Sequence, residues 1–259
     1  MPTLSYTTAG ESHGPGLLAW IDGLPQGLEL DLDFIDNELL RRQGGYGRGG
    51  RQRIETDRAE IITGFRRGHA TGSPLVVRVA NRDDRLDDLK KTPPVHRPRP
   101  GHADLAGSVK WLTTDCRETL ERASARETAV RVAAGAVARC FLRAFGIEVF
   151  GFVRGGMDAM SDVVPNETNW RDLQALRDAS DVYVPDEAVG ERVSEHVQGG
   201  VQVRLRRGRG ERDDLDTEVI TLGERGDDRI SPTPRSSIST LTQHGRVFRQ
   251  RSATWSKNA

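Results

Sequence analysis

The chain lacks the cysteine, histidine and apolar patterns that assign many proteins to a class at once. Its two cysteines, Cys116 and Cys140, form neither a CxxC pair nor a disulfide framework, and such sparse use indicates a reducing compartment. The six histidines are scattered with no HxxxH pair among them, so the sequence predicts no metal site. No signal-like N-terminus or membrane-length apolar run occurs, and we expect a cytoplasmic protein without membrane contact.

Net charge is absent as well. The 38 basic residues balance 38 acidic ones, so no overall field favours nucleic acid or an anionic surface. The basic residues are almost all arginine, whose planar guanidinium suits phosphate and carboxylate recognition, although a GC-rich genome gives the same bias. The chain also lacks a P-loop, a GxGxxG turn in a strand–helix context and a Ser-His-Asp pattern that could be argued as a triad.

Strand-like and helical segments are present without a regular βαβ alternation, which predicts an α+β layered fold rather than a doubly wound sheet. Strands are expected at 4–8, 17–21, 61–62, 75–79 and 147–153. Helices are expected at 33–42 with Asp33 as the cap, at 117–145, at 170–177 and at 185–197. The charged, proline-punctuated stretch 81–99 is interpreted as an exposed excursion.

The longest expected helix has one apolar face and several small residues. Its apolar face comprises Val130, Ala133, Ala134, Val137, Phe141 and Leu142. The small alanines and Gly135 are expected to allow close packing of this helix. After residue 198 the apolar content falls to roughly a quarter, a level at which a segment struggles to offset its ordering entropy. We place no packed domain there.

The first candidate site is the stretch Gly10-Glu11-Ser12-His13-Gly14-Pro15-Gly16. Glycine is used where a chain turns or lets a ligand approach its backbone, and histidine is suited to acid–base work near neutral pH. His13 is therefore a candidate acid–base group, with an ordinary turn histidine as the alternative.

A second candidate is the run 41–53, which places Arg42 and Arg48 among glycines. Several guanidinium groups on a flexible backbone can wrap a small polyanion. A solvated loop or an RNA-contacting segment is the alternative, although Tyr46 is the run's one aromatic residue and single-strand binders stack several.

Two further stretches combine rigid or small residues with polar groups. His102 lies in a Pro- and Gly-rich turn beside Asp104, which suits either a preorganised catalytic group or a turn residue. Arg122, Ala123 and Ser124 open a segment of small residues between two arginines. Small side chains would let a flat ring lie close to the backbone, and a helix–helix contact is the alternative.

These stretches lie in the order found in chorismate synthases, and the chain resembles that family. The similarity rests on Gly10–Gly14, on Arg41-Arg42 with Arg48, on Pro98–Asp104 and on Arg122–Ala136, and it covers residues 1–197. The resemblance implies a β-α-β sandwich, a homotetramer and a small-molecule substrate rather than nucleic acid. The implied reaction is the 1,4-elimination of phosphate from 5-enolpyruvylshikimate 3-phosphate to chorismate, the seventh step of the shikimate pathway, with reduced FMN.

The resemblance also implies roles for the two candidate histidines and the two candidate arginines. His13 matches the family histidine near the leaving phosphate, and His102 matches the one beside the flavin. Arg42 and Arg48 match a pair assigned to NADPH, because some family members reduce their own flavin. Their charge suits the phosphate and carboxylates of the substrate equally well.

The resemblance further implies that Arg122, Ala123 and Ser124 contact FMN. It stops near residue 197, and the family's later Arg-His-Asp segment does not occur in the sequence. The Arg-rich texture of 198–259 is what an out-of-frame reading of GC-rich DNA gives, so our hypothesis is a truncated or frameshifted chain with much of its activity lost. The alternative is a non-catalytic anion- or RNA-binding protein that uses the Arg-Gly loop and the basic tail.

Overall fold

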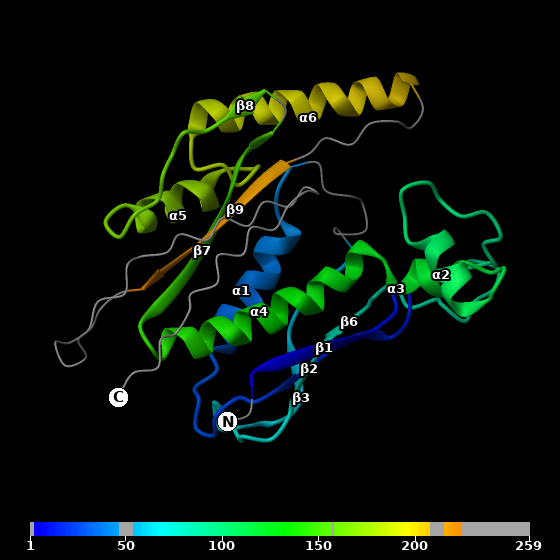
Figure 1. Ribbon diagram of the computed structural model, residues 1–259, viewed down its shortest axis with the longest axis horizontal. Helices are drawn as coiled ribbons and strands as arrows, with labels where there is room; N and C mark the ends of the chain where they lie inside the picture. The colour runs from blue at the N-terminus through cyan, green and yellow to red at the C-terminus, as the bar shows by residue number, and fades with distance from the viewer. Residues whose placement is uncertain (1–2, 47–53, 157, 208–214, 224–259) are drawn as a thin grey trace, which may run out of the picture.

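The structure is a computed structural model that describes residues 3–46, 54–156, 158–207 and 215–223 (Figure 1). The strands are β1 (Ser5–Gly10), β2 (Gly16–Asp22), β3 (Glu60–Thr63), β4 (Phe65–Arg66), β5 (His69–Ala70), β6 (Leu75–Ala80), β7 (Ile147–Gly156), β8 (Ala159–Met160) and β9 (Leu215–Gly223). The helices are α1 (Leu32–Gln43), α2 (Asp104–Trp111), α3 (Arg117–Arg122), the 3₁₀ turn η2 (Ala125–Glu127), α4 (Thr128–Arg143), α5 (Trp170–Ala179) and α6 (Glu187–Arg207).

The helix α4 lies between two antiparallel sheets (Figure 1). On one side it contacts β2 and β6 of a four-stranded sheet in the order β1-β2-β6-β3, with α1 packed beside it. On the other side it contacts β7, which pairs with β8 and β9. These layers form a β-α-β sandwich and confirm the expected α+β fold.

The main core lies between the four-stranded sheet and α4. Every second residue of β2 and β6 points into it, as the period of a half-buried strand requires: Leu17, Ala19, Ile21, Leu75, Val77 and Val79. The facing side of α4 contributes Val130, Ala133, Ala134 and Val137, as its expected apolar face predicted. The sequence therefore predicted the two strands and the apolar face of the helix, and the structure shows which strand residues face it.

The second sheet has smaller cores of its own. Phe150 and Phe152 of β7 stack with ring centroids 5.5 Å apart and pack against Trp170 and Leu173 of α5. The helix α6 begins close to the expected position and runs to Arg207, and β9 pairs with β7. The remaining parts of the expected tail, 208–214 and 224–259, lie outside the described residues. Within the described part of the chain, no helix is long and apolar enough to span a membrane.

The expected continuous helix over 117–145 is wrong, because the chain breaks between α3 and η2. Ser124 adopts an extended conformation, and its side chain accepts a hydrogen bond from the backbone N–H of Arg126. The break lets the Arg126 guanidinium enter the protein interior, where it has buried partners. The periodic spacing of apolar residues predicts a helix but does not indicate where a buried polar contact interrupts it.

Two smaller expectations also need correction. The cap of α1 is Asp31, not Asp33, because the Asp31 carboxylate accepts the backbone N–H of Phe34 at 2.9 Å. The stretch 81–99 is not exposed throughout, because Asn81 and Thr92 are buried. Both are polar side chains that bind backbone carbonyls of the fold, which composition alone does not reveal.

Gly135 was expected to permit close packing of the long helix, but it lies exposed in the interior of α4. A Cβ added there meets nothing within 4 Å. Because glycine costs a helix about 1 kcal/mol relative to alanine, Gly135→Ala should raise the free energy of unfolding by about 0.5–1 kcal/mol. Denaturant unfolding of the full chain measures this change, and a lower midpoint would contradict the open packing.

Candidate active site

The Gly10–Gly16 stretch forms the turn between β1 and β2, and a buried asparagine holds it. Asn81 donates from Nδ2 to the carbonyl of Glu11 at 3.0 Å and to that of Gly14 at 2.7 Å. The backbone N–H of Ser12 donates to the carbonyl of Glu121 at 3.1 Å, which ties the turn to α3. The turn is therefore fixed on both sides rather than flexible.

Gly10 gives the turn its entry angle. Its φ is +106°, and a Cβ there would lie 2.4 Å from the Gly16 carbonyl oxygen. Gly10→Ala should therefore lower the free energy of unfolding by about 2–4 kcal/mol, through backbone strain and overpacking together. Urea unfolding tests this, with Gly27→Ala as the matched control.

Gly27 also has a positive φ, +82°, but open space around its Cβ position. The control therefore reports backbone strain alone, about 1–2 kcal/mol. Equal losses of unfolding free energy in the two variants would show that the close approach of Gly10 to β2 does not contribute to the cost of the substitution.

His13 points its ring at a buried carboxylate. Its Nδ1 lies 2.8 Å from Oε2 of Glu121, and the same oxygen accepts the backbone N–H of His13 at 3.0 Å. The Glu121 side chain is wholly buried, and its other oxygen accepts from Arg117 at 3.2 Å. The His13 side chain itself is 17% exposed, so its outer edge reaches solvent.

The outer nitrogen of His13 lies between a guanidinium and a carboxylate. Arg85 approaches Nε2 at 3.4 Å, and Oδ2 of Asp83 lies 3.6 Å from it. Arg85 and Asp83 also pair with each other at 3.1 Å. The carbonyl of His13 accepts the backbone N–H groups of Arg85 and Leu86, so the loop that carries Asp83 and Arg85 is fixed to the Gly10–Gly16 turn.

A buried arginine of η2, Arg126, links the turn to the segment that precedes β3. Arg126 is 5% exposed at its side chain and donates to Asp57 at 2.5 Å and to Asn81 at 2.7 Å. It also donates to the carbonyl of Ala80 and lies 3.6 Å from Glu55. Because Asn81 in turn holds the Gly10–Gly16 turn, Arg126 supports the backbone on which His13 is placed.

Arg42 is part of this same network. Its guanidinium donates to Asp57 at 3.2 Å, to the hydroxyl of Thr128 at 3.1 Å and to the carbonyl of Ala125 at 3.0 Å. The side chain is 12% exposed. It therefore joins α1 to the chain break before α4, while the other expected arginine, Arg48, lies outside the described residues.

The expected flavin segment lies at that chain break. Ala123 is exposed and Ser124 half-buried, so small side chains do face outward there. Arg122 donates to the carbonyl and hydroxyl of Thr8, each at 2.9 Å, and pairs with Glu127. Burial raises the pKa of Glu127, but hydrogen bonds from Arg131, Thr8 and Arg122 outweigh it and hold that pKa below its usual value. An exposed small-residue surface with a hydroxyl and a guanidinium beside it fits contact with a flat anionic cofactor.

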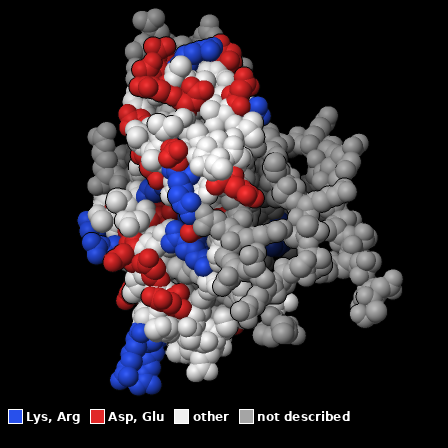
Figure 2. All heavy atoms as spheres, turned by 90° about the vertical axis from the view of Figure 1, so that its left-hand side faces the viewer, with Lys and Arg blue, Asp and Glu red and all other residues white. Residues whose placement is uncertain are grey.

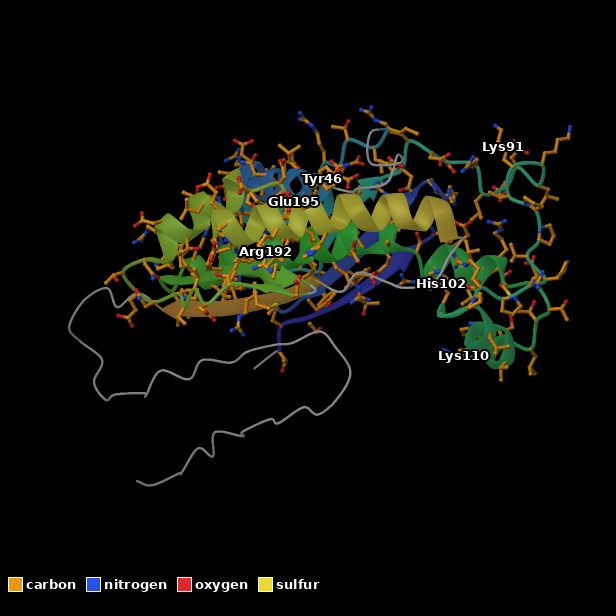
Figure 3. The ribbon with its side chains drawn as sticks, turned by 90° about the horizontal axis from the view of Figure 1, so that it is seen from above. Tyr46, Lys91, His102, Lys110, Arg192 and Glu195 are labelled. Carbon is orange, nitrogen blue, oxygen red and sulfur yellow. The ribbon has the colours of Figure 1, made fainter. Side chains whose placement is uncertain are left out.

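His102 is exposed beside α2. In Figure 3 it lies with Lys110 at one end of the molecule, while Arg192 and Glu195 lie on α6. Its turn is fixed by Arg99, which donates to both oxygens of the buried Asp104 at 2.8 and 2.9 Å. The hydrogen bond to Asp104 is the main cause that raises the pKa of Arg99, and the negative charge of Glu121 raises it further by a smaller amount.

The Arg99–Asp104 pair makes stability depend on acid pH. Hydrogen bonds from Arg99 lower the pKa of Asp104 from 3.8 to about 2. A carboxyl whose pKa is lowered by folding stabilises the protein above its unfolded pKa, and this contribution is lost as the pH falls toward the folded value. Because Arg99 is 39% exposed, solvent screening limits the contribution to about 1–2 kcal/mol.

We therefore expect Asp104→Asn to be less stable than the parent chain near neutral pH. The difference should shrink as the pH falls from 3.8 to about 2, because in this range the carboxyl is already protonated in the unfolded parent chain but still ionised in the folded one. Denaturant unfolding at several pH values measures it. A difference that stayed constant down to the lowest pH would contradict the ion pair as its cause.

The structure thus brings His13, Arg42 and Arg122 to connected positions around the start of α4. The residues that connect them were missed at the sequence level: Asp57, Asn81, Glu121 and Arg126. Arg126 lay inside the segment already singled out, and the Arg117–Glu121 spacing of four is a recognisable helix pair. Such a pair usually indicates a solvated helix face, so the sequence offered no sign that Glu121 is buried.

The fold and these contacts define an α+β protein with a partly exposed histidine held among paired arginines and carboxylates. The chorismate synthase family model matches residues 4–203 of the chain. Chorismate synthase of Carboxydothermus hydrogenoformans is 54% identical over 156 residues, 57% of this chain and 41% of that protein. Chorismate synthase of Geobacter sulfurreducens is 47% identical over 207 residues, 76% of this chain and 52% of that protein. The chain belongs to the chorismate synthase family.

A solved structure described as a chorismate synthase gives the same result for the fold. It superposes with a TM-score of 0.63 at 33% identity, covering 85% of this chain and 59% of the solved chain. The chain spans about half the length of the curated relatives that it matches. These comparisons give no support to the RNA-binding alternative, and the face in Figure 2 shows basic and acidic side chains interspersed.

Proposed function

We propose that this chain performs chorismate synthase chemistry, the 1,4-elimination of phosphate from 5-enolpyruvylshikimate 3-phosphate to give chorismate. The observation that supports it most directly is His13, held by the buried Glu121 in a fixed turn with its outer nitrogen toward solvent. A phosphate leaving group needs a proton, and a histidine suits that donation near neutral pH. The family match over residues 4–203 includes this turn.

The substrate carries a phosphate and two carboxylates, so it requires cationic groups around the proton donor. Arg85 lies beside the outer nitrogen of His13 and is 40% exposed, which leaves it accessible to an anion. Arg42, in contrast, is engaged with Asp57, Thr128 and Ala125. We therefore propose that Arg42 holds α1 against the start of α4 through these contacts. Arg48 would then contact the anion directly, and that anion would be NADPH or the substrate.

Reduced FMN is the cofactor that we propose, and when bound it supplies electron density to an elimination that is redox-neutral overall. Arg122, Ala123 and Ser124 would hold it at the break between α3 and η2. Ala123 lets a ring approach the backbone, and Ser124 provides a hydroxyl. His102, exposed in its rigid turn, would stand beside the cofactor and adjust its protonation.

We further propose a cytoplasmic homotetramer whose family-like domain is 1–197, with 198–259 as an atypical Arg/Gly-rich tail. The family match that reaches residue 203 supports a boundary near this position. Reading the encoding DNA in the other frames tests the frameshift hypothesis. An Arg-His-Asp segment should then appear downstream in another frame, and its absence there would refute the hypothesis.

The proposed function is tested by mixing the purified full chain anaerobically with reduced FMN and the substrate. We expect a change in the flavin absorbance spectrum and release of inorganic phosphate that requires the reduced cofactor. Omission of FMN and replacement by oxidised FMN are the controls. No spectral change and no phosphate release would show that the proposal is wrong for this chain, and salt-sensitive RNA retention would then favour the alternative.

A further inference from the structure

We propose that Glu121 is a positioning residue for His13, an inference that rests on the proposed function. Its buried carboxylate fixes the orientation of the imidazole and keeps the ring proton on Nδ1. The outer nitrogen, Nε2, is then the atom that gains and releases the proton given to the leaving group. Glu121 acts through His13 and does not itself touch the substrate.

One carboxylate oxygen fixes the histidine at two points. Oε2 of Glu121 accepts the backbone N–H of His13 at 3.0 Å and lies 2.8 Å from its ring Nδ1. Binding both groups to one atom couples the ring to its own backbone, so the side chain has little freedom to turn. A catalytic group needs this kind of fixed rotamer before substrate arrives.

The second oxygen of Glu121 keeps the carboxylate itself from rotating. Oε1 accepts from Arg117 at 3.2 Å, and Arg117 is anchored to the carbonyl of Pro93 at 2.7 and 3.0 Å. The side chain of Glu121 is wholly buried, and a buried charge is costly unless it is paired and hydrogen-bonded. Arg117 supplies the paired charge that a buried carboxylate needs.

The ionised carboxylate determines which ring nitrogen carries the proton. A carboxylate is an acceptor only, so a neutral imidazole must place its hydrogen on Nδ1 to form this bond. Nε2 then carries a lone pair in the neutral ring and an N–H in the charged ring. Arg85 at 3.4 Å can donate to the first, and Asp83 at 3.6 Å can accept from the second. Both protonation states of His13 therefore have a partner at the reactive edge.

Glutamine at position 121 separates this role from simple packing. Glu121→Gln keeps the size of the side chain but replaces one acceptor oxygen by an NH₂ donor. The new NH₂ group must point either at Arg117 or at His13. Both sides already present N–H donors, the Arg117 guanidinium on one and the His13 backbone N–H on the other. Facing His13, the NH₂ group forces the ring proton from Nδ1 to Nε2. Glu118→Gln is the matched control, since Glu118 is exposed on the same helix.

The experiment is ¹⁵N NMR of the histidine-labelled full chain in alkaline buffer, where the rings are neutral, with His13 assigned from the signal lost in His13→Asn. We expect the Nδ1–H tautomer in the parent chain and in Glu118→Gln, and a shift toward Nε2–H in Glu121→Gln. For phosphate release, we expect Glu121→Gln to lower kcat about 10–100-fold with little change in KM.

The Nε2–H tautomer in the parent chain would overturn the proposal, and this measurement needs no variant. An unchanged tautomer together with an unchanged kcat in a folded Glu121→Gln would overturn it as well, because neither the position of the ring proton nor the reaction would then depend on the carboxylate. If the parent chain releases no phosphate, the proposed function fails, while the tautomer measurement still decides whether Glu121 orients His13.

Discussion

Replacing His13 with alanine should slow FMN-dependent phosphate release about 10²–10⁴-fold, the usual contribution of a positioned general acid. His13 is the ring placed between buried Glu121 and the solvent-facing pair Asp83 and Arg85. Its loss removes the proposed proton donor while leaving the arginines that we propose to bind the anionic substrate. We therefore expect the effect in kcat rather than in KM.

His69→Ala is the matched control for this experiment. His69 is an exposed histidine in β5 whose ring binds the carbonyl of Arg67, so its loss should leave the rate within about two-fold, as for most surface substitutions. His13→Asn adds a second comparison, because its amide can still donate to Glu121 but cannot act as an acid near neutral pH. Rates equal to the parent in both His13 variants would refute the role of this residue.

Replacing Arg126 with methionine should lower the free energy of unfolding by about 3–5 kcal/mol, the cost of breaking a buried ion pair from one side. Arg126 is 5% exposed and neutralises Asp57 and Glu55, which are themselves buried. Methionine fills much of the same volume but leaves those carboxylates with less positive charge. It also removes the donor to Asn81, which holds the turn of His13.

Arg131→Met is the matched control for Arg126→Met. Arg131 is 51% exposed and pairs with Glu127 on the helix surface, so its loss should cost no more than about 1 kcal/mol. The double variant Arg126→Met with Asp57→Asn should lose less than the sum of the two single losses, because both members of the pair are removed together. Additive losses would contradict direct coupling between Arg126 and Asp57.

Much of the fold was predictable, because strand and helix periods follow from which residues are apolar. The strands at 17–21 and 75–79 and the apolar face of α4 were predicted correctly, and they form the main core. The break at Ser124 was not predictable in the same way. It depends on Arg126 reaching buried acceptors on distant segments, and periodicity describes the apolar face of a helix without indicating which polar group is buried.

The same distinction between local and distant information applies to the candidate site. His13, Arg42 and Arg122 were identified from short motifs, and their proposed roles, with those of Arg48 and His102, stay predictions. Their partners could not be identified, because His13 and Glu121 are 108 positions apart and Arg126 and Asp57 are 69 apart. A local pattern holds no information on contacts between segments so far apart.

The sequence by itself determined the secondary-structure pattern, the apolar faces of the main core and membership of the chorismate synthase family. Local propensity, strand alternation and the order of short motifs are all properties of neighbouring residues. Only the tertiary structure decided that Glu121 is buried against His13 and that Arg126 supports the turn. Chain closure brings those groups together, and burial in the folded protein determines that their charges must be paired.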